Sequence, residues 1–217
     1  MKVLFIAKEN DDYGRKAGAY ILKQYPDSVL VFGKRGEPMP EAVNNWQGDL
    51  IISYLSPWII PPNLLEKAAF ASINFHPGSP DYPGIGCTNF ALYNQEKEFG
   101  ITCHHMLKKV DTGNIIAVSR FPIHENDSVW TLTQRCYSAI SELFLTVMND
   151  LKDRGVFMES SENWTREAYR RKELNELCRI SPEMSEEEIN KRIRATTFPN
   201  MPGAFIELYG KRFIFTE

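Results

Sequence analysis

The side chains best suited to catalysis are an amide, an imidazole and a carboxylate, at Asn74, His76 and Asp111. Asn74 and His76 are two residues apart, and in a strand such side chains point to the same side. An amide and an imidazole can donate hydrogen bonds to a developing oxyanion, and a carboxylate beside the imidazole would orient and charge it. This set suits acyl transfer to an amine, which needs no nucleophilic side chain from the protein.

Each of these residue types also has an ordinary structural explanation. An asparagine before a loop often acts as a cap, and an aspartate in an Asp-Thr-Gly turn commonly forms the turn itself. A histidine in a loop is more often a surface or hydrogen-bonding group, and we interpret His104, His105 and His124 in that way. The prediction of a site therefore depends on Asn74, His76 and Asp111 occurring together.

The first half of the chain alternates apolar runs with amphipathic segments, which is typical of βαβ units and a parallel sheet. We predict buried strands at 3–7, 28–32, 50–54 and 71–75, and helices at 13–24 and 62–69. Open parallel sheets bind ligands at the carboxyl ends of their strands. Asn74 and His76 lie at such an end, and the Pro-Gly-Ser-Pro sequence that follows prevents the strand from continuing.

Two more strands are expected at 100–110 and 114–122, joined by a tight turn that contains Asp111. Ser128 precedes apolar residues that recur at helical spacing as far as Leu151, so it should cap a long helix. This part of the sequence would bring Asp111 to a strand end, as the site requires.

The composition becomes charge-rich after the long helix. Ser185 begins a capping box that opens a helix through about residue 195, and a terminal hairpin is predicted at 204–208 and 212–215. We therefore expect a catalytic core at 1–155 and an extension at 156–217 that contains a helix and a β-hairpin.

The overall composition disfavours several classes of partner. A formal net charge of -3 argues against a nucleic-acid surface, which relies on clustered Lys and Arg. No stretch approaches the ~20 apolar residues of a membrane span, and the first residues do not resemble a signal peptide. The four cysteines show no CxxC pairing and should be reduced. We expect a cytoplasmic protein without nucleic-acid or membrane partners.

Two other kinds of site are disfavoured by the residue pattern. A nicotinamide-dependent oxidoreductase would begin with the same βαβ pattern, but residues 8–12 after the first strand contain no GxGxxG. His104 and His105 are adjacent and would lie on opposite faces of a strand, which is poor geometry for two ligands of one ion. His76 with Asp111 gives too few ligands, so no metal is expected.

Three segments resemble the formyltransferase family that uses 10-formyltetrahydrofolate. They are NFHPG with PDYPG (74–84), GCTNFALYN (86–94) and VDTGNII (110–116). The resemblance implies an α/β fold with a Rossmann-like formyltransferase core and a mostly parallel sheet, extended by the small C-terminal helix and hairpin. It implies an N-formyltransferase with 10-formyltetrahydrofolate as co-substrate, and Asn74, His76 and Asp111 match the family's catalytic trio.

The resemblance also implies binding residues. The loop that packs on the pterin in relatives matches Ser56, Pro57, Trp58, Ile59 and Ile60, and the turn with Val110 and Asp111 would close the other side of the pocket. Two positions beside the site depart from the family pattern, because Pro83 stands where many relatives have Arg and Cys87 where many have Pro.

Acceptor-binding residues are also proposed at the sequence level. Pro77 and Gly78 would lie beside the acceptor, and a diphosphate would need cations, for which Lys8, Arg15 and Arg194 are the candidates. Phe198 or Tyr209 could stack on a base, since nucleobases favour aromatic faces. For the three cations the ordinary alternative is a solvated surface charge. For the two aromatic residues it is a role in the core or in the hairpin.

The acceptor itself is implied by the tail. Residues 188–208 resemble the end of bacterial sugar N-formyltransferases, which favours a nucleotide-linked amino sugar, with dTDP-4-amino-4,6-dideoxyglucose as the preferred acceptor in surface polysaccharide (O-antigen) biosynthesis. A 3-amino or UDP-linked sugar stays open, as do a purine precursor, a hydrolase of formyl-folate and a non-catalytic folate sensor. Two other acceptors fit the sequence less well. Methionyl-tRNA formyltransferases append a basic barrel, whereas this chain is acidic, and glycinamide ribonucleotide formyltransferases have His-Pro-Ser-Leu-Leu-Pro where this chain has His-Pro-Gly-Ser-Pro at 76–80.

By analogy with relatives, the terminal hairpin could supply the interface of a homodimer.

Overall fold

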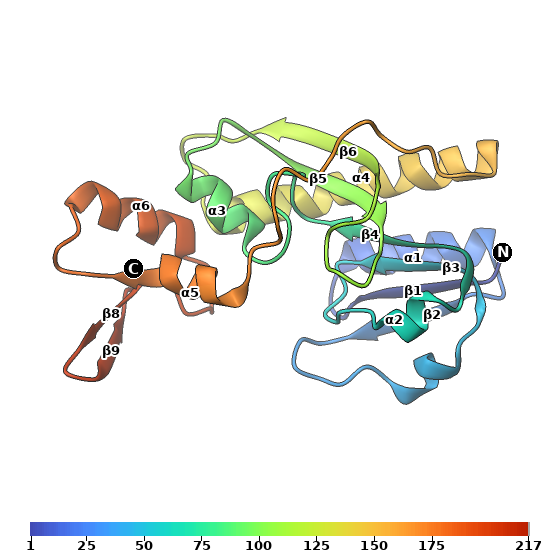
Figure 1. The fold of residues 1–217 in the computed structure, drawn as a ribbon, viewed down its shortest axis with the longest axis horizontal. Helices are drawn as coiled ribbons and strands as arrows, with labels where there is room; N and C mark the ends of the chain where they lie inside the picture. The colour runs from blue at the N-terminus through green and yellow to red at the C-terminus, as the bar shows by residue number, and fades with distance from the viewer. Residues whose placement is uncertain (217) are drawn as a thin grey trace.

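The central element is a six-stranded sheet with the strand order β2-β1-β3-β4-β5-β6 (Figure 1). The structure is a computed structural model that describes residues 1–216. The strands are β1 (Val3–Lys8), β2 (Val29–Gly33), β3 (Gly48–Tyr54), β4 (Ala68–His76), β5 (Glu98–His105) and β6 (Ile115–Pro122). The first four are mutually parallel, whereas β5 is antiparallel to both β4 and β6. The predicted α/β fold with a mostly parallel sheet is confirmed.

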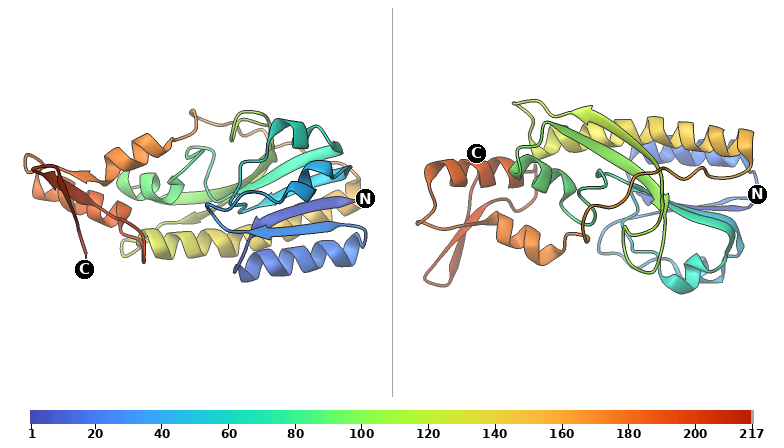
Figure 2. Two further views of the ribbon diagram at one scale, coloured as in Figure 1. Left: turned by 90° about the horizontal axis from the view of Figure 1, so that it is seen from below. Right: turned by 45° about the horizontal axis from the view of Figure 1, so that its top comes forward.

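The two faces of the sheet are covered by different elements (Figure 2). Helices α1 (Asp12–Gln24) and α4 (Val129–Arg154) pack on one face, in a core that includes Phe5, Ile52 and Phe75. The other face carries Leu4 and Ile6 in a smaller core, under the 3-10 helix η1 (Glu41–Asn45) and α2 (Pro62–Leu65). Neighbouring residues of β1 serve opposite cores because side chains alternate along a strand. Continuous apolar runs therefore reflect burial on both faces.

The long helix begins where the sequence predicts. Ser128 Oγ accepts a hydrogen bond from Thr131 N, and Thr131 Oγ1 accepts one from Ser128 N, so the N-terminus is capped reciprocally. The helix ends at Arg154, and its C-cap Gly155 has a φ of 75°, in the left-handed region that favours glycine. None of the helices within residues 1–216 is long and apolar enough to cross a membrane.

The C-terminal part lies at the end of the molecule away from the N-terminus (Figure 1). It contains α5 (Arg171–Cys178), β7 (Arg179–Ile180), α6 (Glu186–Thr196), β8 (Phe205–Leu208) and β9 (Lys211–Ile214). Strands β8 and β9 form the predicted hairpin, and β7 adds a parallel strand beside β8. The predicted helix and hairpin are confirmed, although α5 and β7 were not predicted. The division at residue 155 stays a prediction, and Glu217 lies outside the described residues.

Residues 156–170, called the strap below, have little regular structure but are bound to the core. Ser160 N donates to Ile115 O, Thr165 N to Pro80 O and Tyr169 N to Pro83 O. The strap thus leads from the end of α4 back across the sheet to α5 (Figure 1). It connects the sheet with the C-terminal part.

Two predicted boundaries are wrong. The strand predicted at 100–110 ends at His105, and residues 106–114 form a loop, because Met106 N turns back to donate to Ser72 O. The helix predicted at 62–69 ends at Leu65, because β4 begins at Ala68 in register with Gly48. Helix α3 (Cys87–Tyr93) was not predicted at all. The first correction matters for the site, because Asp111 lies within the loop 106–114 and not at the end of a strand.

Candidate functional site

Four polar side chains meet near the carboxyl end of β4. Asn74 Nδ2 lies 3.1 Å from His104 Nε2, and His104 Nε2 lies 3.1 Å from Asp111 Oδ1. Asp111 Oδ2 lies 3.4 Å from His76 Nδ1. The structure therefore brings together the three predicted residues and adds His104, which the sequence had indicated only as a hydrogen-bonding or surface group.

Strand pairing explains why these side chains share one location. Asn74 and His76 point to the same face of β4, and in the antiparallel pairing with β5 the residue opposite Asn74 is His104. Directly paired residues of antiparallel strands have side chains on the same face and within about 5 Å. His105, the next residue, faces the other side against Phe157. The expectation that the two adjacent histidines lie on opposite faces is confirmed.

Asp111 reaches the cluster from the loop 106–114 rather than from a strand. Its φ of 48° is in the left-handed region, which turns the chain so that its carboxylate points inward. Gly84 N donates to Asp111 Oδ2 at 2.7 Å. Gly113 completes the turn because a Cβ there would lie 1.9 Å from His105 O. The backbone geometry therefore requires a glycine at position 113, and the contacts of the carboxylate require an aspartate at position 111.

The buried carboxylate of Asp111 is held in its ionised form. Burial by itself raises the pKa, but His76, His104 and the Gly84 N–H together lower the pKa of Asp111 to about 2. All three side chains are almost inaccessible, with exposed fractions of 6% for Asp111, 4% for His76 and 2% for His104. A buried charge of this kind is stable only with such partners.

The hydrogen bonds also restrict where protons can be. His76 Nε2 faces Tyr82 O at 3.0 Å, and His104 Nδ1 faces His105 O at 2.8 Å. A carbonyl oxygen only accepts, so each of these nitrogens carries a proton. The nitrogen that faces Asp111 carries one only when the ring is an imidazolium. Both nitrogens of each ring therefore have a polar partner.

Trp164 of the strap packs against both histidines. Its ring makes edge contacts with His104 at a centroid distance of 4.9 Å and with His76 at 5.9 Å. Trp164 Nε1 donates to Gly113 O at 2.8 Å, which fixes the indole against the Asp111 turn. No sequence pattern had indicated Trp164, because it lies more than fifty residues from the turn it contacts.

A cavity of about 330 Å³ opens beside the polar cluster. Asn74, His76, His104 and Asp111 all line it. Of the residues expected to bind a cofactor, Ser56, Trp58, Ile59, Ile60 and Val110 line this cavity, while Pro57 lines an adjoining one. Ser56 Oγ accepts from Trp58 N, and Gly33 leaves space for the indole, since a Cβ there would be 2.0 Å from it.

The other end of this cavity is strongly apolar. Ile59, Leu107 and Val110 line it with exposed fractions of 76%, 57% and 41%. Large aliphatic side chains exposed together in a concave site are typical of a surface that a ligand covers. The site thus joins a polar, proton-carrying end to an apolar end suited to a flat organic ligand.

The residues predicted to hold an acceptor are dispersed. Pro77 lines the cavity, and Gly78 packs behind His76, with a Cβ there only 2.5 Å from His76 Nε2. Lys8 also lines the cavity, 3.8 Å from Asp11 and over the Tyr137 ring. Burial lowers the pKa of Lys8, while Asp11 opposes that shift. These positions keep their predicted binding roles as predictions.

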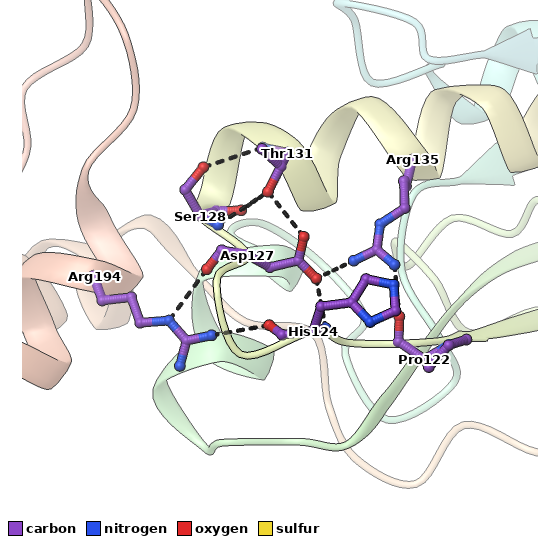
Figure 3. A network of polar contacts seen from close by, with 7 residues as sticks. All are labelled: Pro122, His124, Asp127, Ser128, Thr131, Arg135 and Arg194. Carbon is purple, nitrogen blue, oxygen red and sulfur yellow. Dashed lines mark hydrogen bonds and ion pairs between the residues drawn. The ribbon is translucent and has the colours of Figure 1, made fainter.

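Arg15 and Arg194 have protein partners. Arg15 pairs with Asp12 on the exposed side of α1. Arg194 Nε donates to Asp127 O at 3.1 Å, and Arg194 Nη2 donates to His124 O at 3.4 Å. Both carbonyls belong to the polar network at the start of α4 (Figure 3). Two of the five N–H donors of the Arg194 guanidinium thereby tie α6 to the start of α4.

The two aromatic candidates differ in their surroundings. Phe198 packs edge-on against Trp130 at 5.3 Å and lines two cavities beyond the polar cluster. Tyr209 lies at the tip of the hairpin with its side chain fully in solvent. Only Phe198 therefore adjoins a cavity that continues from the site.

The two departures from the family pattern lie directly behind the cluster. Pro83 O accepts from Tyr169 N of the strap. Cys87 Sγ donates to Pro77 O at 3.0 Å, and burial raises the pKa of the Cys87 thiol to about 12. A thiol with that pKa is not a nucleophile at neutral pH, so Cys87 supports the loop after β4 by packing. Within residues 1–216 there is no group of three or more His, Cys, Asp or Glu side chains that could hold a metal ion.

Comparisons with known proteins identify the family of the chain. The family model described as formyl transferase matches residues 26–148. A GDP-perosamine N-formyltransferase of Brucella melitensis is 32% identical over 172 residues, covering 77% of this chain and 64% of the relative. The chain thus spans somewhat less than two thirds of that relative.

Solved structures show the same fold at lower identity. A sugar N-formyltransferase from Shewanella superposes with a TM-score of 0.78 and 18% identity, covering 99% of this chain and 96% of the other. An N-formyltransferase from Helicobacter canadensis, solved with folinic acid and dTDP-3-aminofucose, has a TM-score of 0.73 and 22% identity, with coverages of 97% and 85%. By its matched segment and by its fold, the chain belongs to the formyl transferase family.

Proposed function

We propose that this protein transfers the formyl group of 10-formyltetrahydrofolate to the amine of a nucleotide-linked amino sugar. The observation that carries the proposal is the cluster of Asn74, His104, Asp111 and His76 at the polar end of a cavity whose other end is apolar. Acyl transfer to an amine needs hydrogen-bond donors for charge on the acyl oxygen and a group that moves a proton. Asn74 and His76 are the groups to which we assign these two tasks.

The apolar end of the cavity suits the pterin of a reduced folate. Trp58, Ile59 and Val110 offer flat apolar contact on two sides, and backbone groups of the 55–60 loop can hydrogen-bond the ring edge. Membership of the formyl transferase family supports this co-substrate, and the Helicobacter canadensis neighbour was solved with folinic acid. A folate bound in this way would present its formyl group to Asn74 and His76.

The proposed chemistry assigns each residue a separate task. When the acceptor amine attacks, a nitrogen–carbon bond forms to the formyl carbon, and the bond from that carbon to the folate nitrogen breaks. Asn74 Nδ2 and the His76 ring stabilise negative charge on the formyl oxygen. His76 helps to move the proton that the amine loses to the departing folate nitrogen, for which its Nε2 must exchange the hydrogen bond to Tyr82 O for one to the substrate, while Asp111 orients the ring at Nδ1.

The acceptor is proposed to be dTDP-4-amino-4,6-dideoxyglucose, used in surface polysaccharide (O-antigen) biosynthesis. Support comes from the tail at 188–208 and from neighbours whose names specify nucleotide-linked sugars, a GDP-perosamine enzyme and a complex with dTDP-3-aminofucose. A 3-amino or UDP-linked sugar is the alternative within this class.

The proposed compartment is the cytoplasm. The four cysteines are all free, which supports a reducing compartment of this kind.

A homodimer through the hairpin is part of the proposal. Leu208, Phe213 and Ile214 are exposed there with fractions of 42%, 52% and 48%. Size-exclusion chromatography with light scattering should give twice the 25.0 kDa chain mass, and Phe213→Glu should halve it. A monomeric wild-type protein would exclude this interface.

The activity is tested by mixing purified protein, 10-formyltetrahydrofolate and a panel of nucleotide-linked amino sugars. We expect formylated sugar with one of them, and loss of product in Asn74→Ala and His76→Ala. His124→Ala is the matched control, because that exposed histidine contributes only backbone groups to its contacts. Formate release that is equal with and without sugar would mean hydrolysis instead, and full turnover in the two variants would remove these residues from the mechanism.

A further inference from the structure

Two cavities continue from the formyl-transfer site toward the C-terminal part. The first has a volume of about 700 Å³ and is lined at one end by Gly84 and Val110, beside Asp111. The second has a volume of about 350 Å³ and is lined by Asn89, Thr133 and Phe198 among others. Arg35 and Arg171 line both cavities and therefore mark their junction.

These two arginines differ from most others in the chain. Arg120, Arg135 and Arg192, for example, each have a carboxylate partner. For Arg35 and Arg171 no carboxylate oxygen of residues 1–216 lies within 4.0 Å. Burial and the positive charge of Arg35 lower the pKa of Arg171. Two cations are thus held near each other without a counter-charge from the described protein.

The fold places them there from distant parts of the sequence. Arg35 lies in the loop after β2, and Arg171 is the first residue of α5, where the strap ends. Gly84 allows the strap to approach, because a Cβ there would lie 2.4 Å from Tyr169 O. Ile85 N then donates to Tyr169 O, which fixes the start of α5 beside the cavity. The position of Arg171 is therefore built by backbone contacts at the site.

We propose that Arg35 and Arg171 bind the diphosphate of the nucleotide-linked sugar, with the sugar beside Gly84 and Asp111 and the nucleoside in the cavity lined by Phe198. This inference rests on the proposed function. A diphosphate carries oxygens along its length that two planar guanidiniums can bind bidentately. The order of the cavities also matches the order of the substrate: reacting sugar, diphosphate, nucleoside.

The assignment moves the diphosphate away from Arg15 and Arg194. Arg15 is paired with Asp12, and Arg194 is bonded to two carbonyls at the start of α4. Phe198, by contrast, keeps the role in base binding that the sequence indicated for it, since it lines the second cavity. A folate carboxylate is the other anion that could reach the arginines from the first cavity, which also contains Trp58 and Ile59.

The test uses the full chain and titration calorimetry without folate. The probes are dTDP, UDP and GDP, each compared with its nucleoside. We expect wild type to bind one nucleoside diphosphate, and Arg35→Ala and Arg171→Ala each to weaken it about tenfold or more while leaving nucleoside binding unchanged. Arg154→Ala, an exposed arginine at the end of α4, is the control and should bind as wild type does.

Steady-state kinetics distinguish the two anions. In Arg35→Ala and Arg171→Ala, the KM for the nucleotide sugar should rise about tenfold while the KM for 10-formyltetrahydrofolate stays constant. A rise in the folate KM alone, diphosphate affinity within twofold of wild type, or no binding of any nucleoside diphosphate would overturn the inference. Diphosphate binding that depends on both arginines, in a protein that formylates no sugar, would support this site and refute the proposed function.

Discussion

Replacing His104 tests whether the cluster acts as a unit. His104→Ala removes the ring that contacts Asn74 and Asp111, each at 3.1 Å, and leaves the carboxylate with one imidazole instead of two. A hydrogen bond to a charged group contributes roughly 1.5–3 kcal/mol. If this contribution is fully expressed in the transition state, at about 1.4 kcal/mol per factor of ten, kcat should fall roughly 10- to 150-fold. His104→Gln, which keeps an N–H donor, should recover part of the loss.

The matched control is His105→Ala. His105 is the adjacent residue of the same type, but its ring faces away from the cluster, and its carbonyl, which His104 Nδ1 contacts, is retained in alanine. Formyl transfer is measured for all three variants at saturating substrates between pH 5.5 and 9, with thermal unfolding as the check on folding. We expect the His104 variants to change the pH profile as well as kcat. If His104→Ala keeps wild-type kcat at every pH, the ring has no part in catalysis.

Three further perturbations follow from the site geometry. The pKa of Asp111 is lowered from 3.8 to about 2, so its carboxylate stabilises the fold above pH 4 and loses this contribution as the pH falls toward 2. Asp111→Asn should therefore lower the free energy of unfolding in urea by about 2 kcal/mol at pH 7 and by less at pH 3. An equal loss at both pH values would contradict this link between pKa and stability. Gly78→Ala should lower kcat by displacing His76, since the new Cβ would lie 2.5 Å from its Nε2, and unchanged kcat would show that the loop yields. Gly33→Ala should raise the KM for the folate but not for the sugar by pushing Trp58 out of place; a rise in the sugar KM instead would contradict the assignment of Trp58.

The parallel strands could be predicted from the sequence because each is a short apolar run buried on both faces. The pair Asn74 and His76 could be predicted as well, because side chains two apart on a strand share a face whatever the partner strand is. The boundary at His105 could not, because Met106 and Leu107 continue the apolar pattern while their contacts are with the cavity and with Ser72. Local pattern does not distinguish a strand from a loop that lines an apolar site.

His104 and His105 show most clearly what sequence alone leaves open. They are adjacent and of the same type, yet one contacts Asp111 and the other packs on Phe157. The difference depends on the register of β5 against β4, and a shift of one residue would exchange them. Trp164 and Arg171 pose the same difficulty over a longer distance, because the strap and a short polar helix acquire their roles only where they meet the sheet.

The strap has one more consequence, for local stability. It holds Trp164 against the two histidines and, a few residues later, leads into Arg171 at the junction of the outer cavities. Its attachment includes single backbone hydrogen bonds from Thr165 and Tyr169, the Arg120–Glu162 ion pair and the stacking of Tyr169 on Phe90. Segments held in this way tend to open as one cooperative unit. In hydrogen exchange the amides of Thr165 and Tyr169 should therefore show one common free energy of opening. A single opening event would uncover the polar cluster around Asp111 and displace Arg171 at the same time.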